Sequence, residues 1–479
     1  MKIKKTLISI LTGFCISLMI AGLFTACNEN STTNSSMENK KTESLGLEYT
    51  LNKDNNSYSV VSVGTCQDTD IVIPSKYEEK PITAIWANAF NGYAALTSIT
   101  IPESVTSIGE DAFYDTAYYN NEENWENGVL YIGNYLIRAK TSINGTYTIK
   151  DGTKCIASSA FYECDNLTNI TIPNGVTTIN SSAFYECDNL TSITMPESVT
   201  TMGSMVFWKC KKLKNIVLSS NLTSIESWAF YECDTLSNIV IPDSVTLISS
   251  SAFESCKKLE TVQIGNSVAT IADKAFFECN SLTSIEIPNS VETIGPEAFW
   301  NCHNLERIDI GSGLRSIVGE VFYCCSALKE VYITDIVAWC NISFRGGSCN
   351  PLSCATKLYL NNELITQLVI PETVTMINAY AFLNCQMITS VIIPSSVKFI
   401  DHDAFLQCSN LTSVYYEGTT EDWQDVQVEY MNQPLMNATR YYYSETEPAL
   451  NTDGTAYDGN YWHYDTDGIT PVVWVYKKD

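Results

Sequence analysis

The chain has few of the residues on which most enzymes and nucleic-acid-binding proteins depend. It holds three histidines among 479 residues, and 28 lysines and arginines against 54 acidic residues give a formal net charge of −26. So acidic a protein is repelled by phosphate backbones and by anionic membrane surfaces. The motifs Gly-x-Ser-x-Gly and His-Glu-x-x-His do not occur, and a phosphate-binding loop is also missing. We therefore expect no enzymatic activity, no cofactor, no metal site and no nucleic-acid partner.

The first 27 residues predict a targeting segment. Lysines at positions 2, 4 and 5 precede an apolar stretch over 6–23, and small residues then lead to Cys27. This ending resembles the lipobox of bacterial lipoproteins, which implies cleavage before Cys27 and lipidation of its thiol. A secretory signal without lipid and an uncleaved anchor helix are the alternatives. Residues 28–44 are polar and predict a disordered tether, which would hold an exported chain at the membrane.

The dominant feature of the sequence is a motif that recurs every 23 residues. A small apolar residue followed by phenylalanine closes each segment, and a fixed period in this range predicts a solenoid of stacked coils. The phenylalanines are Phe90, Phe113, Phe161, Phe184, Phe207, Phe230, Phe253, Phe276, Phe299, Phe322, Phe382 and Phe405.

One repeat, from Phe161 to Phe184, indicates how a coil is built. Apolar residues at positions 170 and 172 flank Thr171, which is the alternation of a strand, and Pro173 ends it because proline lacks an amide proton. The following Ser-Ser-Ala-Phe-Tyr-Glu-Cys stretch predicts a short helical corner. Stacked coils would then share one core and one parallel sheet.

The pattern Leu-x-x-Ile-x-Ile-Pro-x-x-Val-x-x-Ile-x-x-x-Ala-Phe-x-x-Cys, as in Leu167 to Cys187, resembles the leucine-rich repeat of BspA-like bacterial surface proteins. The match runs from about residue 45 to 416. It implies a leucine-rich repeat solenoid with a parallel sheet. Members of this family are secreted or cell-surface proteins implicated in adhesion, so the resemblance also implies localisation at the bacterial cell surface.

The regular array has ends and interruptions. We expect an N-terminal cap over 45–80, repeats over 81–416 and a C-terminal cap over 417–479, with insertions at about 118–148 and 334–366. Turn dipeptides in the first insertion predict a hairpin of Val129–Ile132 with Tyr135–Ile137.

The second insertion has a relative in the C-terminal cap. Trp339 and Asn350-Pro351-Leu352 correspond to Trp423 and Asn432-Gln433-Pro434-Leu435. This similarity predicts one packing device used twice, in which a buried tryptophan braces the edge of the coil. A final hairpin is predicted for 461–464 with 472–476.

Ten of the 18 cysteines lie three residues after a repeat phenylalanine. Coils about 4.8 Å apart do not suit a disulfide, whose Cβ atoms lie about 3.8 Å apart, so we interpret this column as buried free thiols. Four further cysteines could form a local disulfide, bind zinc or simply be buried, and they contain no Cys-x-x-Cys motif. These are Cys324, Cys340, Cys349 and Cys354.

The residue after each repeat phenylalanine is usually aromatic. Such a row offers ring surface for docking a protein or glycan, and the alternative is that the rings shield the coil corner. The possible ligand-contact residues are Tyr162, Tyr185, Trp208, Tyr231, Trp300 and Tyr323.

Together these features predict a monomeric, lipid-anchored surface protein that acts as a recognition or adhesion scaffold for a protein or glycan ligand. The alternatives are a structural surface spacer without a specific ligand, or a cell-wall-acting enzyme whose carboxylates the sequence does not single out.

Overall fold

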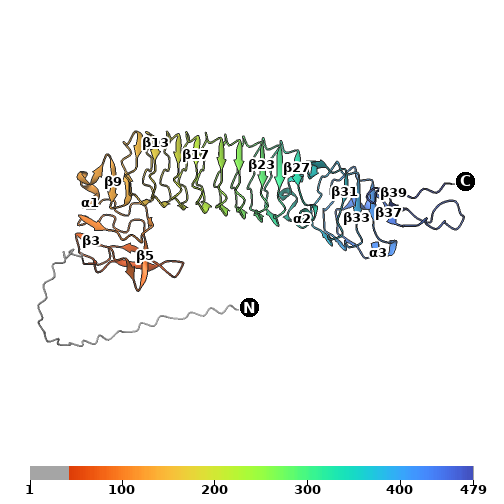
Figure 1. Ribbon diagram of the computed structural model, residues 1–479, viewed down its shortest axis with the longest axis horizontal. Coiled ribbons are helices and arrows are strands. Elements are labelled where there is room, and N and C mark those ends of the chain that lie inside the picture. Colours follow the sequence, from red (N-terminus) through yellow and green to blue (C-terminus); the bar gives the residue numbers. More distant parts are fainter. Residues whose placement is uncertain (1–41, 478–479) are drawn as a thin grey trace, which may run out of the picture. The chain divides into compact units, whose positions relative to one another are not determined.

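The computed structural model describes residues 42–477, and within Glu43–Asp479 the chain forms one compact unit of stacked coils (Figure 1). The predicted targeting segment, Cys27 and nearly all of the tether lie outside the described residues. Among the residues that are described, no helix has the length and apolar character needed to cross a membrane.

Each coil contributes a strand to the first strand row, where the sequence predicted one. The strand β13 (Leu167–Thr171) ends two residues before Pro173 and pairs in parallel with β15 (Ser192–Thr194) at a register of Asn169 with Ser192. Ile170 is buried and Thr171 is exposed, as the alternation predicted. The row consists of β11 (Gly145–Thr148), β13, β15, β17 (Asn215–Val217), β19 (Asn238–Val240), β21 (Thr261–Gln263), β23 (Ser284–Ile287), β25 (Arg307–Ile310), β27 (Glu330–Ile333), β29 (Lys357–Leu360), β31 (Gln367–Val369), β33 (Ser390–Ile393), β35 (Ser413–Tyr416) and β37 (Thr439–Tyr443).

A second strand row, which was not predicted from the sequence, lines another side of the coils. The strands of this row, such as β14 (Thr178–Ile179), are only two or three residues long, too short for an alternation to be recognised. The row consists of β12 (Cys155–Ile156), β14, β16 (Thr201–Met202), β18 (Ser224–Ile225), β20 (Leu247–Ile248), β22 (Thr270–Ile271), β24 (Thr293–Ile294), β26 (Ser316–Val318), β28 (Ser343–Arg345), β32 (Met376–Ile377), β34 (Phe399–Ile400) and β36 (Gln427–Val428).

The prediction of short helical corners was wrong, because the corners are runs of turns. In the coil of Phe161, Ser159 and Glu163 have φ angles of 57° and 55°, in the left-handed region that a right-handed helix excludes. The N–H of Phe161 donates to the carbonyl of Ala183 in the next coil over 2.7 Å. The corner backbone therefore serves the contact between coils and is not free to form a helix.

The core of the stack is a set of ladders. The Phe161 and Phe184 rings are parallel with centroids 5.2 Å apart, and the same stacking continues coil by coil to Phe322. The described cysteines are free, and those of the predicted column are buried. This confirms the interpretation of the column as packing residues.

The first insertion divides the core into two clusters. The predicted hairpin is confirmed: β9 (Val129–Ile132) pairs antiparallel with β10 (Tyr135–Ala139), and β8 (Trp125–Glu126) adds a third strand. Alternate side chains enter different clusters, since Tyr131 and Leu136 pack with the long repeat core while Leu130 and Tyr135 pack with the N-terminal one. The hairpin therefore contributes side chains to both core clusters.

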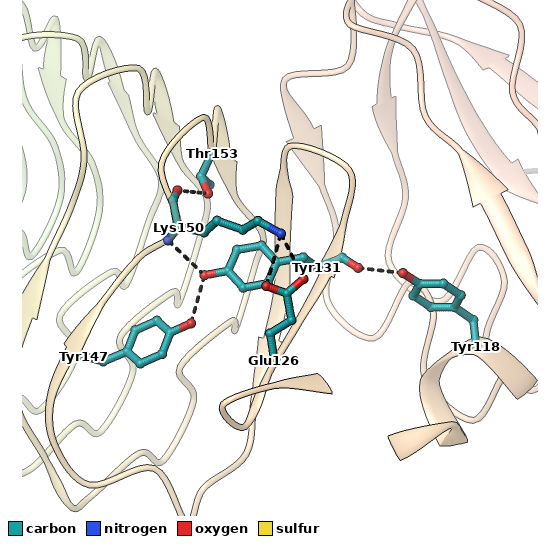
Figure 2. Close-up of polar contacts among 6 residues, drawn as sticks. All are labelled: Tyr118, Glu126, Tyr131, Tyr147, Lys150 and Thr153. Atoms are coloured by element: carbon teal, nitrogen blue, oxygen red, sulfur yellow. Dashed lines mark hydrogen bonds and ion pairs between the residues drawn. The ribbon is translucent and has the colours of Figure 1, made fainter. Parts of the chain in front are cut away.

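Hydrogen bonds connect the hairpin to the segments before and after it (Figure 2). The Tyr118 hydroxyl donates to the Tyr131 carbonyl over 2.8 Å, and the Tyr131 and Tyr147 hydroxyls lie 3.0 Å apart. The Lys150 amide donates to the Tyr131 hydroxyl over 3.3 Å, and its ammonium pairs with Glu126 over 2.9 Å. Tyr131 thus links residues that precede the hairpin to residues that follow it.

The packing device of the second insertion and of the C-terminal segment is confirmed. Trp339 is buried and donates its indole N–H to the Ala381 carbonyl over 2.7 Å, and Trp423 is also buried. Asn350 caps Leu352 and donates to Tyr380, and Asn432 donates to Asp401 and accepts from Phe405. The tryptophans lie on α2 (Ile336–Cys340) and α3 (Thr420–Gln424), and the Pro-Leu pairs on η3 (Pro351–Ser353) and α4 (Gln433–Asn437).

The remaining elements lie at the ends and in the insertions. The predicted C-terminal hairpin is confirmed by the antiparallel pairing of β38 (Tyr461–Tyr464) with β39 (Pro471–Val473). The others are β1 (Glu48–Leu51), β2 (Tyr58–Ser62), β3 (Asp70–Val72), β4 (Lys76–Tyr77), β5 (Lys80–Ile85), β6 (Ser98–Thr100), β7 (Ser107–Ile108), α1 (Ala117–Asn120), η1 (Glu122–Asn124), η2 (Gly347–Cys349) and β30 (Glu363–Leu364).

Candidate functional site

The predicted aromatic row forms two separate stacks along the coil corners. In the first stack, Tyr162 and Tyr185 have centroids 4.9 Å apart, Tyr185 and Trp208 are 5.8 Å apart, and Trp208 and Tyr231 are 4.1 Å apart. All four rings are half-buried, and neighbouring rings are within 21° of parallel. Each ring face inside the stack is therefore covered by the next ring, and a ligand meets ring edges and hydroxyls.

The N-terminal end of the first stack is covered as well. The guanidinium of Arg138, on β10, lies 5.7 Å from the centroid of the Tyr162 ring. Burial, a hydrogen bond with Glu163 and nearby carboxylates raise the pKa of Tyr162 to about 12. The Tyr162 hydroxyl therefore stays neutral, and its ring is packed against the guanidinium of Arg138.

Glu254 interrupts the row after Tyr231. The second stack begins at Phe277, whose centroid lies 6.2 Å from that of Trp300, and Trp300 lies 4.5 Å from Tyr323. Tyr323 is 47% exposed. The structure thus brings four of the predicted residues together and places Trp300 and Tyr323 in a different group.

A cluster that the sequence did not predict lies on the outer face of the first strand row. The Arg307 guanidinium lies 3.6 Å from the Tyr332 centroid, and the Tyr332 and Tyr359 rings stack 4.3 Å apart. Arg307 also donates to both carboxylate oxygens of Asp309, over 2.7 and 2.5 Å. Strands β25, β27 and β29 hold these side chains in register on one surface.

A carboxylate fixes the tyrosines of this cluster. Glu330 accepts hydrogen bonds from Tyr332 and Tyr359 over 3.1 and 3.2 Å, and its carboxylate lies 3.5 Å from the Lys357 ammonium. Partial burial opposes ionisation of Glu330, but these hydrogen bonds and the lysine outweigh it, so the net effect is a lowered pKa. The cluster is therefore charged and rigid at neutral pH.

A hollow of about 600 Å³ lies beside this cluster on the same face. Its lining includes Gln263, Glu286, Arg307 and Asp309. An adjoining hollow of about 340 Å³ shares Glu286 and Asp309 and reaches Tyr332. The signal in the sequence was the run of charged and aromatic residues at outward strand positions between 286 and 359, where the preceding strands carry mostly Ser, Thr and Asn.

The described cysteines outside the regular column are free. Cys354 donates to the Phe322 carbonyl over 3.3 Å, so it takes the place of a column cysteine within the second insertion. Cys349 donates to Gly319 over 2.6 Å, Cys340 is buried and Cys324 is exposed. Within residues 42–477 no group of three or more metal-ligating side chains could hold a metal ion.

Comparison with family models decides the family. The model described as the BspA type leucine rich repeat region matches in six copies, over residues 64–145, 132–260, 229–348 and 354–429. The chain belongs to the BspA-type leucine-rich repeat family. No curated protein matches it.

Solved structures of related repeat proteins are similar to this BspA-type chain. A leucine-rich cell surface protein from Faecalibacterium prausnitzii is 28% identical, covering 81% of this chain and 98% of that one with a TM-score of 0.31. A leucine-rich repeat protein from Bacteroides ovatus is 24% identical, covering 83% and 98% with a TM-score of 0.41. A repeat solenoid of this family presents long surfaces suited to molecular interaction.

Proposed function

We propose that this BspA-type protein is a lipid-anchored recognition scaffold at the bacterial cell surface, which binds a protein or glycan ligand on the first strand row. The observation that carries the proposal is the hollow beside the Arg307–Tyr332 stack. Together with the adjoining hollow it combines two carboxylates, a fixed guanidinium and a tyrosine on a rigid sheet. Ordered polar groups around a concave surface bind with little entropic cost.

The hollow has one carboxylate that the chain leaves uncompensated. Glu286 is exposed, and no described residue forms an ion pair or side-chain hydrogen bond with it. Asp309, by contrast, is neutralised by Arg307. A ligand that brings hydroxyl or cationic donors to Glu286 and acceptors to Arg307 would satisfy both.

The test is an array of glycans and host proteins probed with the chain from Asn28 onward. Arg307→Ala should weaken any specific ligand at least tenfold, since it removes a fixed donor and frees Asp309. Lys329→Ala is the matched control, because Lys329 is exposed and pairs only loosely with Glu306 at 3.9 Å. Equal binding by both variants would contradict a site at the hollow, and an array without any ligand would favour the spacer alternative.

Export and anchoring form the second part of the proposal, supported by the N-terminal sequence. Residues 1–27 would direct export, lipid on Cys27 would hold the protein, and residues 28–44 would act as a tether to the capped repeat array. Cys27→Ala should leave the protein uncleaved or released from the membrane. Membrane retention of a cleaved Cys27→Ala protein would contradict the lipid anchor.

A further inference from the structure

At Glu254 the aromatic row carries a carboxylate in place of a ring. Beneath it the buried ladder is uninterrupted, with Phe253 stacked 5.1 Å from Phe230 and 5.2 Å from Phe276. The coils are therefore in regular register, and only the outer ring is missing. Two coil steps of about 4.8 Å each separate the Tyr231 and Phe277 rings by roughly 10 Å. We name this place, bounded by Tyr231, Glu254 and Phe277, the Glu254 slot.

The carboxylate in the slot has no partner of its own. Glu254 is half-buried, and no described residue forms an ion pair or side-chain hydrogen bond with it. The nearby cation Lys274 pairs instead with Glu297 in the following coil at 3.4 Å, and its ammonium lies 5.5 Å from the centroid of the Phe277 ring. Lys209 lies on the other side of Tyr231, 3.9 Å from Glu186 and 4.0 Å from Glu232.

Two further carboxylates flank the slot. Glu232 and Glu278 occupy equivalent positions in the coils before and after, and Glu278 accepts a hydrogen bond from Ser255 over 3.1 Å. Burial, a hydrogen bond with Glu232, and the charges of Glu232, Glu254 and Glu278 raise the pKa of Tyr231 to about 12. Three carboxylates thus surround the slot, with Lys209 beside Glu232 and Lys274 beside Phe277, and its tyrosine remains neutral.

The chain itself shows what covers a ring face of this kind. At the start of the first stack, the Arg138 guanidinium lies over Tyr162. Arg307 lies over Tyr332 while paired with Asp309, and Arg440 lies 4.0 Å from the centroid of Trp423. In these three contacts a guanidinium occupies the ring face, and at Arg307 it also engages a carboxylate. Lysine ammonium groups lie over four further rings, those of Tyr58, Trp125, Tyr131 and Phe277. Among the described residues, no cation lies over the Tyr231 ring, and the one over Phe277 is a lysine, not an arginine.

We propose that the Glu254 slot receives the guanidinium of an arginine side chain from a polypeptide partner. A flat cation midway between the rings would lie about 5 Å from both centroids, within the roughly 6 Å reach of a cation–π contact. Its fork of N–H donors matches the free carboxylate of Glu254, and guanidinium is less strongly hydrated than ammonium. This inference specifies a ligand for the recognition function proposed above, at a second place on the surface.

The first experiment measures binding of N-acetyl-arginine methylamide to the chain from Asn28 onward, by ligand-observed NMR titration. The neutral isostere N-acetyl-citrulline methylamide and the corresponding lysine derivative serve as comparison probes. We expect the arginine probe to bind at least tenfold more tightly than citrulline and several-fold more tightly than lysine. Equal affinity for arginine and lysine would overturn the assignment to guanidinium, and equal affinity for citrulline would overturn a cation site.

Variants locate the binding. Glu254→Tyr restores the ring found at the same position of other repeats and fills the slot, so it should fold with an unchanged or raised melting temperature and bind the arginine probe at least tenfold more weakly. Glu254→Gln keeps the shape and should also weaken binding. Glu260→Gln removes an exposed carboxylate from the same coil and should leave the affinity unchanged.

Retained affinity in Glu254→Tyr, or an equal loss in Glu260→Gln, would overturn the slot as the site. The Arg307→Ala protein should bind the arginine probe normally. A failure of the array test therefore leaves this inference standing, and a failure of the probe test leaves the hollow beside Arg307 untouched.

Discussion

The thiol of Cys187 donates a hydrogen bond to the backbone carbonyl of Phe161, in the preceding coil, over 3.1 Å. The relationship repeats along the array at 3.0 to 3.2 Å for the other pairs of adjoining repeats. The cysteine is therefore more than a small apolar residue, since its S–H satisfies a buried carbonyl and joins neighbouring coils.

Removing one of these thiols should destabilise the array. Cys233 is fully buried and bonds to Phe207 over 3.1 Å, so Cys233→Ala loses a hydrogen bond and leaves a small void. We expect a loss of about 1–2 kcal/mol, read as a lower urea midpoint. Cys324→Ala, at an exposed position, is the control and should change stability little. An unchanged midpoint for Cys233→Ala would show that the thiol bond adds nothing.

Stability should fall in alkaline solution. Burial raises the pKa of Cys302 to about 12, from an ordinary value of 9.0. Below pH 9 the thiol is neutral in both states, but between about pH 9 and 12 only the unfolded thiol ionises, so the unfolded state is favoured as pH rises. The free energy of unfolding, measured from pH 7.5 to 10.5, should decline above pH 9.

A variant separates thiols from tyrosines in this profile. Cys302→Ala should reduce the alkaline slope by up to about 1.4 kcal/mol per pH unit, because one titrating group is removed. Buried tyrosines such as Tyr135, whose pKa burial raises to about 12, act in the same direction and remain in the variant. A slope identical to that of the wild type would contradict the thiol contribution.

The hairpin that is shared by both core clusters should contribute to the stability of the protein. Tyr131→Phe removes the hydroxyl that meets Tyr147 and Lys150, and should cost about 1 kcal/mol. Leu136→Ala, at a fully buried position, should cost about 2–5 kcal/mol. Thermal unfolding followed by circular dichroism measures both. Tyr114→Phe is the control, because Tyr114 is 48% exposed.

Trp339, in the second insertion, should stabilise the protein both through its hydrogen bond and through the volume that its ring fills. Trp339→Phe leaves the Ala381 carbonyl without its indole donor and opens a void, for an expected loss of about 2–4 kcal/mol. Trp86→Phe, where Trp86 is 52% exposed, should change the melting temperature little. Comparable shifts for the two variants would contradict a bracing role for Trp339.

The repeat sequence determined much of this protein by itself. A period of 23 residues fixes which positions coincide from coil to coil, so the burial of Phe184 and Cys187 and the strand at Ile193 follow from pattern alone. The hairpin at Val129–Ile132 and the paired Trp339 and Trp423 devices were also legible, because turn dipeptides and internal similarity are local signals.

Only the tertiary structure decided how the surface residues are used. Whether the rings expose their faces or their edges to a ligand depends on the spacing and tilt between coils, which no single repeat determines. In the stack, Tyr185 and Trp208 each cover a face of the other ring. The corner at Ser159 and Glu163 adopts left-handed backbone because its N–H groups bond to the next coil. Likewise, the pairing of Arg307 with Asp309 and Tyr332, and the unfilled place at Glu254, exist only once neighbouring coils are stacked in register.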